Sequence, residues 1–149
     1  MSTHSFELLL KGAEITRMGF FAASILTLRQ TVIYLLEGGR DSHTAMKYFR
    51  YRSSFGFRIR FMLAGIDAMW AKWIERPSHS TDEGIPRYRS EIVLQNTMRQ
   101  FMPADPYYDE QLILAGKAIS CGLFTVTFAS LALLVSVIET AVKVYQLIF

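Results

Sequence analysis

The sequence predicts an all-α integral membrane protein, in which two transmembrane helices are joined by a mostly helical middle region. Three observations lead to this fold class. Residues 118–138 are 21 consecutive positions without a charged side chain, residues 19–36 form a second apolar run, and apolar residues between the two recur at helical spacing. The composition agrees, because 51% of the 149 residues are hydrophobic and only 19% are charged, which is more apolar than a soluble chain requires.

We expect four segments along the chain. They are an N-terminal segment (1–18), a first and weaker transmembrane helix (19–36), a basic and aromatic middle region (37–111), and a second transmembrane helix with the C-terminal end (112–149). About 20 apolar residues of helix cross the hydrocarbon core of a bilayer, so the uncharged run at 118–138 is long enough to span. Its hydroxyl residues, such as Ser136, are tolerated because they can hydrogen-bond to carbonyls of their own helix.

The first apolar run is interrupted by Arg29 and Gln30. A charged residue near a bilayer centre costs about 2.5–3.5 kcal/mol on insertion scales, so both a true span and an amphipathic segment in the interface stay open. In a span, Arg29 and Gln30 would make intramembrane polar contacts, although Arg29 could also snorkel. The second apolar run offers no acid. We therefore expect the partner group to come from another membrane-protein subunit or from a second copy of the chain.

A basic and aromatic stretch, YFRYRSSFGFRIRF, occupies residues 48–61, and positions 40–60 carry six Lys or Arg against one acid. We predict that it binds anionic lipid headgroups, since each basic residue near such a surface contributes about 1 kcal/mol. Two tryptophans further along fit an aromatic belt. The predicted membrane-interface residues are Lys47, Arg50, Arg52, Arg58, Arg60, Trp70 and Trp73.

The alternation of apolar and basic residues at 55–61 would give a strand one apolar and one basic face. This pattern partly resembles the ribonucleoprotein strand of RNA-recognition domains. It departs from that motif at Ser53, Ser54, Arg58 and Arg60, so we do not expect direct nucleic-acid binding. A strand or helix face that only packs in the protein is the other alternative to lipid binding.

The rest of the middle region predicts two helices and a loop. Apolar residues at 59–74 recur every three or four positions, and Pro77 should stop this helix. Residues 78–88 are polar and contain Gly84 and Pro86, which indicates an exposed loop. A second short helix is expected at 90–102.

No pattern of catalytic or metal-binding residues stands out. The three histidines lack a helical pair or a cysteine partner at metal-ligand spacing, so we expect no metal, no cofactor and no enzyme activity. Gly38 and Gly39 lack the lysine and hydroxyl of a phosphate-binding loop, and we expect them to end the first helix. Cys121 fits a small apolar side chain in a long apolar run.

Two functional classes remain, a non-catalytic structural or adaptor subunit of a membrane-embedded complex and a self-assembling small pore. A pore-lining helix should carry polar residues every three or four positions along its length. The first run has them only between Ser24 and Thr31, and the second has scattered hydroxyls. The subunit is therefore the favoured prediction.

The span end YLLEGGRD (34–41), a middle region of about 75 residues and the run at 112–138 together form a layout of span, helical region and span. This layout resembles small two-span inner-membrane proteins of bacterial conjugation and type IV secretion systems, and the N-terminal membrane region of coupling proteins. The resemblance implies a location in the bacterial cytoplasmic membrane and other membrane-protein subunits as partners. It carries no nucleotide-binding residue over to this chain.

Overall fold

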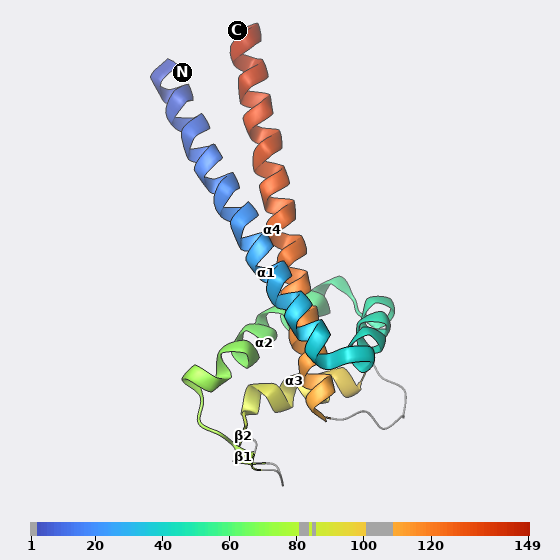
Figure 1. Cartoon of the computed structure of the whole chain (residues 1–149). Helices are drawn as coiled ribbons and strands as arrows, with labels where there is room; N and C mark the ends of the chain where they lie inside the picture. The colour runs from blue at the N-terminus through green and yellow to red at the C-terminus, as the bar shows by residue number, and fades with distance from the viewer. Residues whose placement is uncertain (1–2, 81–83, 85, 101–108) are drawn as a thin grey trace. The chain divides into compact units, whose positions relative to one another are not determined.

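The computed structural model describes residues 3–80, 84, 86–100 and 109–149, and these confirm the all-α class apart from one two-residue ladder (Figure 1). The elements are α1 (Thr3–Arg52), α2 (Phe55–Ile74), β1 (His79–Ser80), β2 (Pro86–Arg87), α3 (Arg89–Arg99) and α4 (Asp109–Ile148). The chain divides into two compact units. Unit 1 comprises Met1–Thr27 and Phe124–Phe149, and unit 2 comprises Leu28–Leu123.

Helix α1 departs from helical backbone angles at Gly39. The φ and ψ angles of Gly39 are 63° and −147°, a region that is populated almost only by glycine. The predicted helix end at Gly38 and Gly39 is thus confirmed as a break in the backbone, after which the helix resumes and reaches Arg52. A Cβ at Gly39 would meet no atom within 4 Å, so the requirement for glycine is conformational rather than steric.

Helix α2 begins at Phe55, four residues before the predicted start, and the strand interpretation of 55–61 is wrong. The Ser54 side chain caps the helix by accepting a hydrogen bond of 3.3 Å from the Phe57 N–H. The helix ends at Ile74, which confirms the predicted stop before Pro77. Proline disfavours helical backbone angles in the residue before it, which here is Arg76.

The predicted loop at 78–88 contains an antiparallel pairing of β1 with β2, in which His79 lies opposite Arg87. The Ser78 N–H extends the pairing with a hydrogen bond of 2.8 Å to the Arg87 carbonyl. Helix α3 confirms most of the predicted short helix, with observed bounds Arg89–Arg99. The predicted end of that helix, at 101–102, lies outside the described residues.

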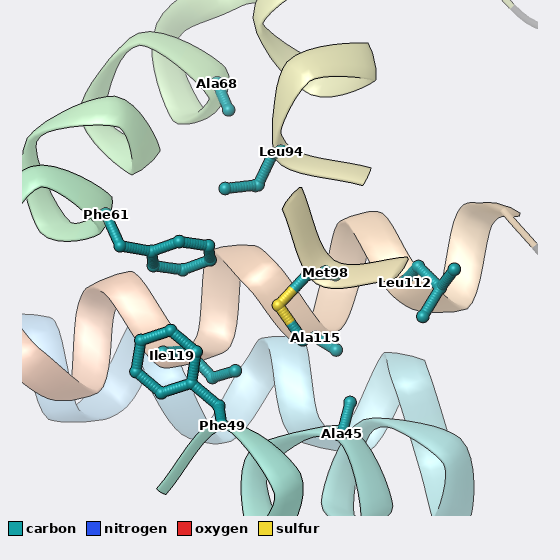
Figure 2. Packing of buried hydrophobic residues seen from close by; sticks show 9 residues of the cluster. All are labelled: Ala45, Phe49, Phe61, Ala68, Leu94, Met98, Leu112, Ala115 and Ile119. Carbon is teal, nitrogen blue, oxygen red and sulfur yellow. The ribbon is translucent and has the colours of Figure 1, made fainter. Parts of the chain in front are cut away.

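The core of unit 2 gathers buried side chains from all four helices (Figure 2). The ring centroids of Phe49 (α1) and Phe61 (α2) lie 4.8 Å apart. The nine core residues are Ala45 and Phe49 of α1, Phe61 and Ala68 of α2, Leu94 and Met98 of α3, and Leu112, Ala115 and Ile119 of α4. The first part of the segment predicted as the second span, 112–119, therefore belongs to this core.

Helices α2 and α4 approach closely where Gly65 faces Ser120. A Cβ added to Gly65 would overlap Oγ and Cβ of Ser120. The Ser120 hydroxyl donates a hydrogen bond of 2.9 Å to the Met62 carbonyl, so this buried hydroxyl is satisfied by the neighbouring helix. Small residues of this kind allow helix backbones to come close.

Unit 1 is an antiparallel pair of helix segments, the start of α1 and the end of α4 (Figure 1). The rings of Phe6 and Tyr145 lie 5.8 Å apart between centroids. Further along the pair, the Thr125 hydroxyl donates a hydrogen bond of 2.9 Å to Thr27 Oγ1. The two helix segments therefore run in opposite directions along their whole contact.

Candidate membrane-facing surface

Helices α1 and α4 are the two described helices that are long and apolar enough to cross a membrane. Unit 1 presents their large apolar side chains to the outside. Soluble monomers rarely expose a contiguous apolar patch larger than a few hundred Å². The exposed residues include Leu8, Ile15, Met18, Phe21 and Leu26 of α1, and Val126, Leu133, Leu134, Val137 and Leu147 of α4.

The charged side chains of unit 1 gather around one cavity of the helix pair. Six of them line a cavity of about 350 Å³ together with Leu10, and we call this set the charged seam. Three acids and three bases leave it without formal net charge. Its members are Glu7, Lys11, Glu14 and Arg17 of α1, and Glu139 and Lys143 of α4.

One ion pair of the charged seam is direct. The Arg17 Nε lies 3.3 Å from Glu139 Oε1, and only 9% of Glu139 is exposed. Spacings of three and four residues place the four charges of α1 on one helix face. Unit 1 therefore exposes large apolar residues along both helices, and the Arg17–Glu139 pair lies between them, whereas Glu7, Lys11, Glu14 and Lys143 are exposed.

Hydroxyl groups of the apolar helices are hydrogen-bonded as the sequence predicts. The Ser136 hydroxyl donates to the Ala132 carbonyl at 3.1 Å, and the Thr140 hydroxyl donates to the Ser136 carbonyl at 2.9 Å. These bonds satisfy the hydroxyls within one helix, as a nonaqueous environment requires.

Arg29 and Gln30, the predicted intramembrane contacts, are exposed residues of unit 2. Gln30 makes a side-chain hydrogen bond with Tyr34, one helical turn further on. Within the described part of the chain, Arg29 has no side-chain hydrogen bond or ion pair. An outside partner for Arg29 stays a prediction.

The basic and aromatic stretch covers the end of α1, the turn at Ser53 and Ser54, and the start of α2. Arg58 holds this turn, because its Nε donates to Ser53 Oγ and its Nη2 donates to the Arg50 carbonyl, both at 2.8 Å. The Arg52 guanidinium lies 5.1 Å from the centre of the Tyr48 ring. Two of the predicted headgroup contacts thus also have partners inside the fold.

The other predicted interface residues lie open to the surroundings. Lys47, Arg50 and Arg60 are exposed. Trp70 and Trp73 are 53% and 76% exposed, on the side of α2 that faces away from the unit 2 core.

Sequence reasoning missed two ion pairs. The first is Arg17 with Glu139, and the second joins Lys117 of α4 to Glu91 of α3, with Nζ 3.6 Å from Oε2. Lys117 also lies 6.0 Å from the centre of the Tyr34 ring. The helical spacing of the charges in α1 could have indicated one charged face, but no signal in the sequence names the partners.

Ser90 and Cys121 make contacts between elements of unit 2. The Ser90 hydroxyl bonds to the Glu75 carboxylate, at the junction of α2 and α3. Cys121 is buried, with its Sγ 3.1 Å from Met69 Sδ. Among the described residues, no group of three or more His, Cys, Asp or Glu could hold a metal ion. Comparison of the chain with protein-family models, curated proteins and solved structures finds no match.

Proposed function

We propose that the chain is a two-span integral membrane protein that acts as a non-catalytic structural or adaptor subunit of a membrane-embedded complex. The distribution of side chains in unit 1 carries the proposal, because large apolar residues face outward along both helices and the Arg17–Glu139 pair lies between them. Burying one large apolar side chain stabilises by about 1.5–3 kcal/mol, and surrounding hydrocarbon provides that burial for many of them at once.

The lengths of the two apolar runs support the same conclusion. The runs at 19–36 and 118–138 have 18 and 21 residues and extend about 27 and 32 Å at 1.5 Å per residue, compared with about 30 Å for the hydrocarbon core. Unit 2 then contains Arg29 of the first span and the middle region at 37–111 that the spans anchor. Its exposed Arg29 and its basic turn are the groups that would contact other subunits and lipid.

The pore alternative is less well supported. An open lumen needs polar groups that face water, whereas Arg17 and Glu139 of the charged seam pair with each other. The layout of span, helical region and span supports a place in a DNA- or protein-transfer apparatus of the bacterial inner membrane, as a proposal from that resemblance alone.

Extraction of membranes with alkaline carbonate tests the membrane part of the proposal. We expect the intact chain to stay in the pellet and to float with vesicles in a density gradient. Release of the chain into the supernatant would refute integral insertion.

A labelling experiment tests the number of spans. In a Cys121→Ala background, His4→Cys, Gln146→Cys and Asn96→Cys are each treated with a membrane-impermeant maleimide in sealed vesicles. Two spans place the first two positions on one side of the bilayer and Asn96 of unit 2 on the other. Labelling of all three from one side would exclude the two-span arrangement.

Purification in mild detergent, followed by identification of co-purifying proteins, tests the subunit role. We expect Arg29→Leu to reduce the recovered partners, because an intramembrane arginine requires a polar or charged group beside it. The matched control is Arg40→Leu, which removes another exposed arginine of α1. Equal partner recovery with wild type and Arg29→Leu would remove the partner role of Arg29.

A further inference from the structure

Helix α2 carries apolar residues on two opposite sides. The inner side, which packs in unit 2, is made of Phe61 and the small residues Gly65, Ala68 and Ala71. The outer side carries the larger residues, at successive spacings of four, four, seven, three and one. Their exposed fractions are 79% for Phe55, 42% for Ile59, 54% for Leu63, 53% for Trp70, 76% for Trp73 and 79% for Ile74, and we call these six residues the outer stripe.

We propose that the outer stripe of α2 lies on the surface of the bilayer, with Trp70 and Trp73 at the depth of the lipid headgroups. This inference rests on the proposed membrane location of the chain and adds a third contact with lipid, parallel to the membrane rather than across it. A helix that lies in the interface has an apolar side facing the acyl chains and basic residues along its edges.

Basic residues lie at both edges of the outer stripe and beyond its C-terminal end. At 3.6 residues per turn, Arg60 falls at one edge, together with Asp67, and Arg58 falls at the other. Lys72 falls on the inner side near the end of the helix, and Arg76 lies beyond Ile74. Arg60, Lys72 and Arg76 are exposed, Arg58 is partly exposed, and Asp67 is the only acid within Phe55–Ile74. Long basic side chains can cover apolar surface with their methylene groups while their charged ends reach phosphate. The chemistry along both edges therefore fits anionic headgroups.

The tryptophans favour a bilayer over another protein as the occupant. Both tryptophans of the chain belong to the outer stripe, next to Lys72 and Arg76 at the C-terminal end of α2. Indole rings are enriched at membrane–water interfaces because their body is apolar and their N–H remains hydrated. If α1 and α4 are held in a bilayer, the chain keeps α2 close to the same bilayer. The contact of α2 with lipid is then intramolecular and needs no separate diffusional encounter.

Tryptophan fluorescence of the full chain in vesicles tests the inference directly, because Trp70 and Trp73 are the only two emitters of this kind. The vesicles are made of phosphatidylcholine and phosphatidylglycerol, with bromine placed on the acyl chain near either the headgroup or the methyl end. We expect the lipid brominated near the headgroup to quench emission about twofold, because indole rings settle at that depth. The lipid brominated at the methyl end should quench less.

Two single-tryptophan variants provide the reference depths. In a Trp70→Phe, Trp73→Phe background, Phe21→Trp reports from the outer side of unit 1, and Asn96→Trp reports from an exposed position of α3. The inference would be overturned if wild-type emission resembled that of the Asn96→Trp variant, that is, if acrylamide quenched it and neither brominated lipid did. Carbonate resistance in the same preparation would show that the proposed spans still stand.

A third outcome identifies a protein occupant instead. Blue-shifted emission that neither brominated lipid nor acrylamide quenches would mean that a second copy of the chain covers the outer stripe, and the bilayer contact would be rejected. The preference for anionic lipid is measured with phosphatidylcholine alone as the comparison. We expect weaker quenching in the neutral vesicles, and equal quenching in both would reject the headgroup contact of Arg60 and Arg76.

Discussion

Arg17 and Glu139 form an ion pair of 3.3 Å although they are 122 positions apart in the chain. The pair lies between two helices whose other sides are apolar and exposed. The Arg17 side chain is 38% exposed and the Glu139 side chain 11%, so removal of Arg17 leaves a nearly buried carboxylate without its compensating charge. The pair therefore fixes which side of α1 faces α4 within unit 1.

Replacement of either partner should weaken unit 1. We expect Arg17→Leu to reduce the free energy of unfolding in detergent micelles by about 1–3 kcal/mol, because the Glu139 carboxylate loses its charged donor. Thermal unfolding followed by circular dichroism measures the loss.

The charge-reversed double variant is the control for this prediction. Arg17→Glu and Glu139→Arg should each destabilise alone, whereas the two together should recover at least half of the loss through the reversed pair. Additive losses in the double variant would mean that the two side chains do not interact.

Gly65→Ala should destabilise unit 2, because the new Cβ would overlap Oγ and Cβ of Ser120. Forcing additional volume into a packed contact costs about 1–3 kcal/mol. Gly56→Ala is the matched control in the same helix, since a Cβ there meets no atom within 4 Å. Chemical denaturation of both variants compares them, and equal stability would contradict the close contact of α2 with α4.

Gly39→Ala should destabilise the chain for a conformational reason rather than a steric one. Alanine at φ 63°, ψ −147° is strained by about 1–3 kcal/mol, although nothing lies near its Cβ. We expect a lower unfolding temperature, or a helix that continues straight through the break. Gly19→Ala, in the same helix and also free of contacts, should be neutral or stabilising.

Arg58→Lys should loosen the turn between α1 and α2. An ammonium cannot reproduce the two hydrogen bonds of 2.8 Å that the guanidinium makes to Ser53 and to the Arg50 carbonyl. We expect a loss of about 1 kcal/mol in stability and faster amide hydrogen exchange at residues 53–57. Arg60→Lys, at an exposed position, should leave exchange there unchanged.

The helices could be predicted because their signals are long or repeated. The uncharged run at 118–138 and the apolar spacing at 59–74 both belong to helices that the structure contains. The strand interpretation of 55–61 failed for a physical reason. Phe57 and Phe61 pack towards the core with Phe49, while Phe55 and Ile59 face outward. Each pair is spaced by four residues, as on a helix, but the two pairs interleave in the sequence and so look like the alternating pattern of a strand.

The buried side of α2 and the partners of the charged residues could not be predicted. The inner contacts use small residues such as Gly65 and Ala68, because a close approach of helices leaves no room for Leu63 or Trp70. Hydrophobicity alone would predict that the larger side chains, such as Leu63 and Trp70, form the core. The pairing of Arg17 with Glu139 depends on how distant helices meet, which local sequence does not encode.

The long separation of Arg17 and Glu139 has a consequence for biosynthesis. At about 5–20 residues per second, the ribosome needs about 6–24 s to make the 122 positions between them. During that interval the acids and bases of the nascent first helix have no charged residues of α4 beside them. Under the proposed membrane location, we expect insertion machinery to shelter the emerging helix until the C-terminal helix has been translated.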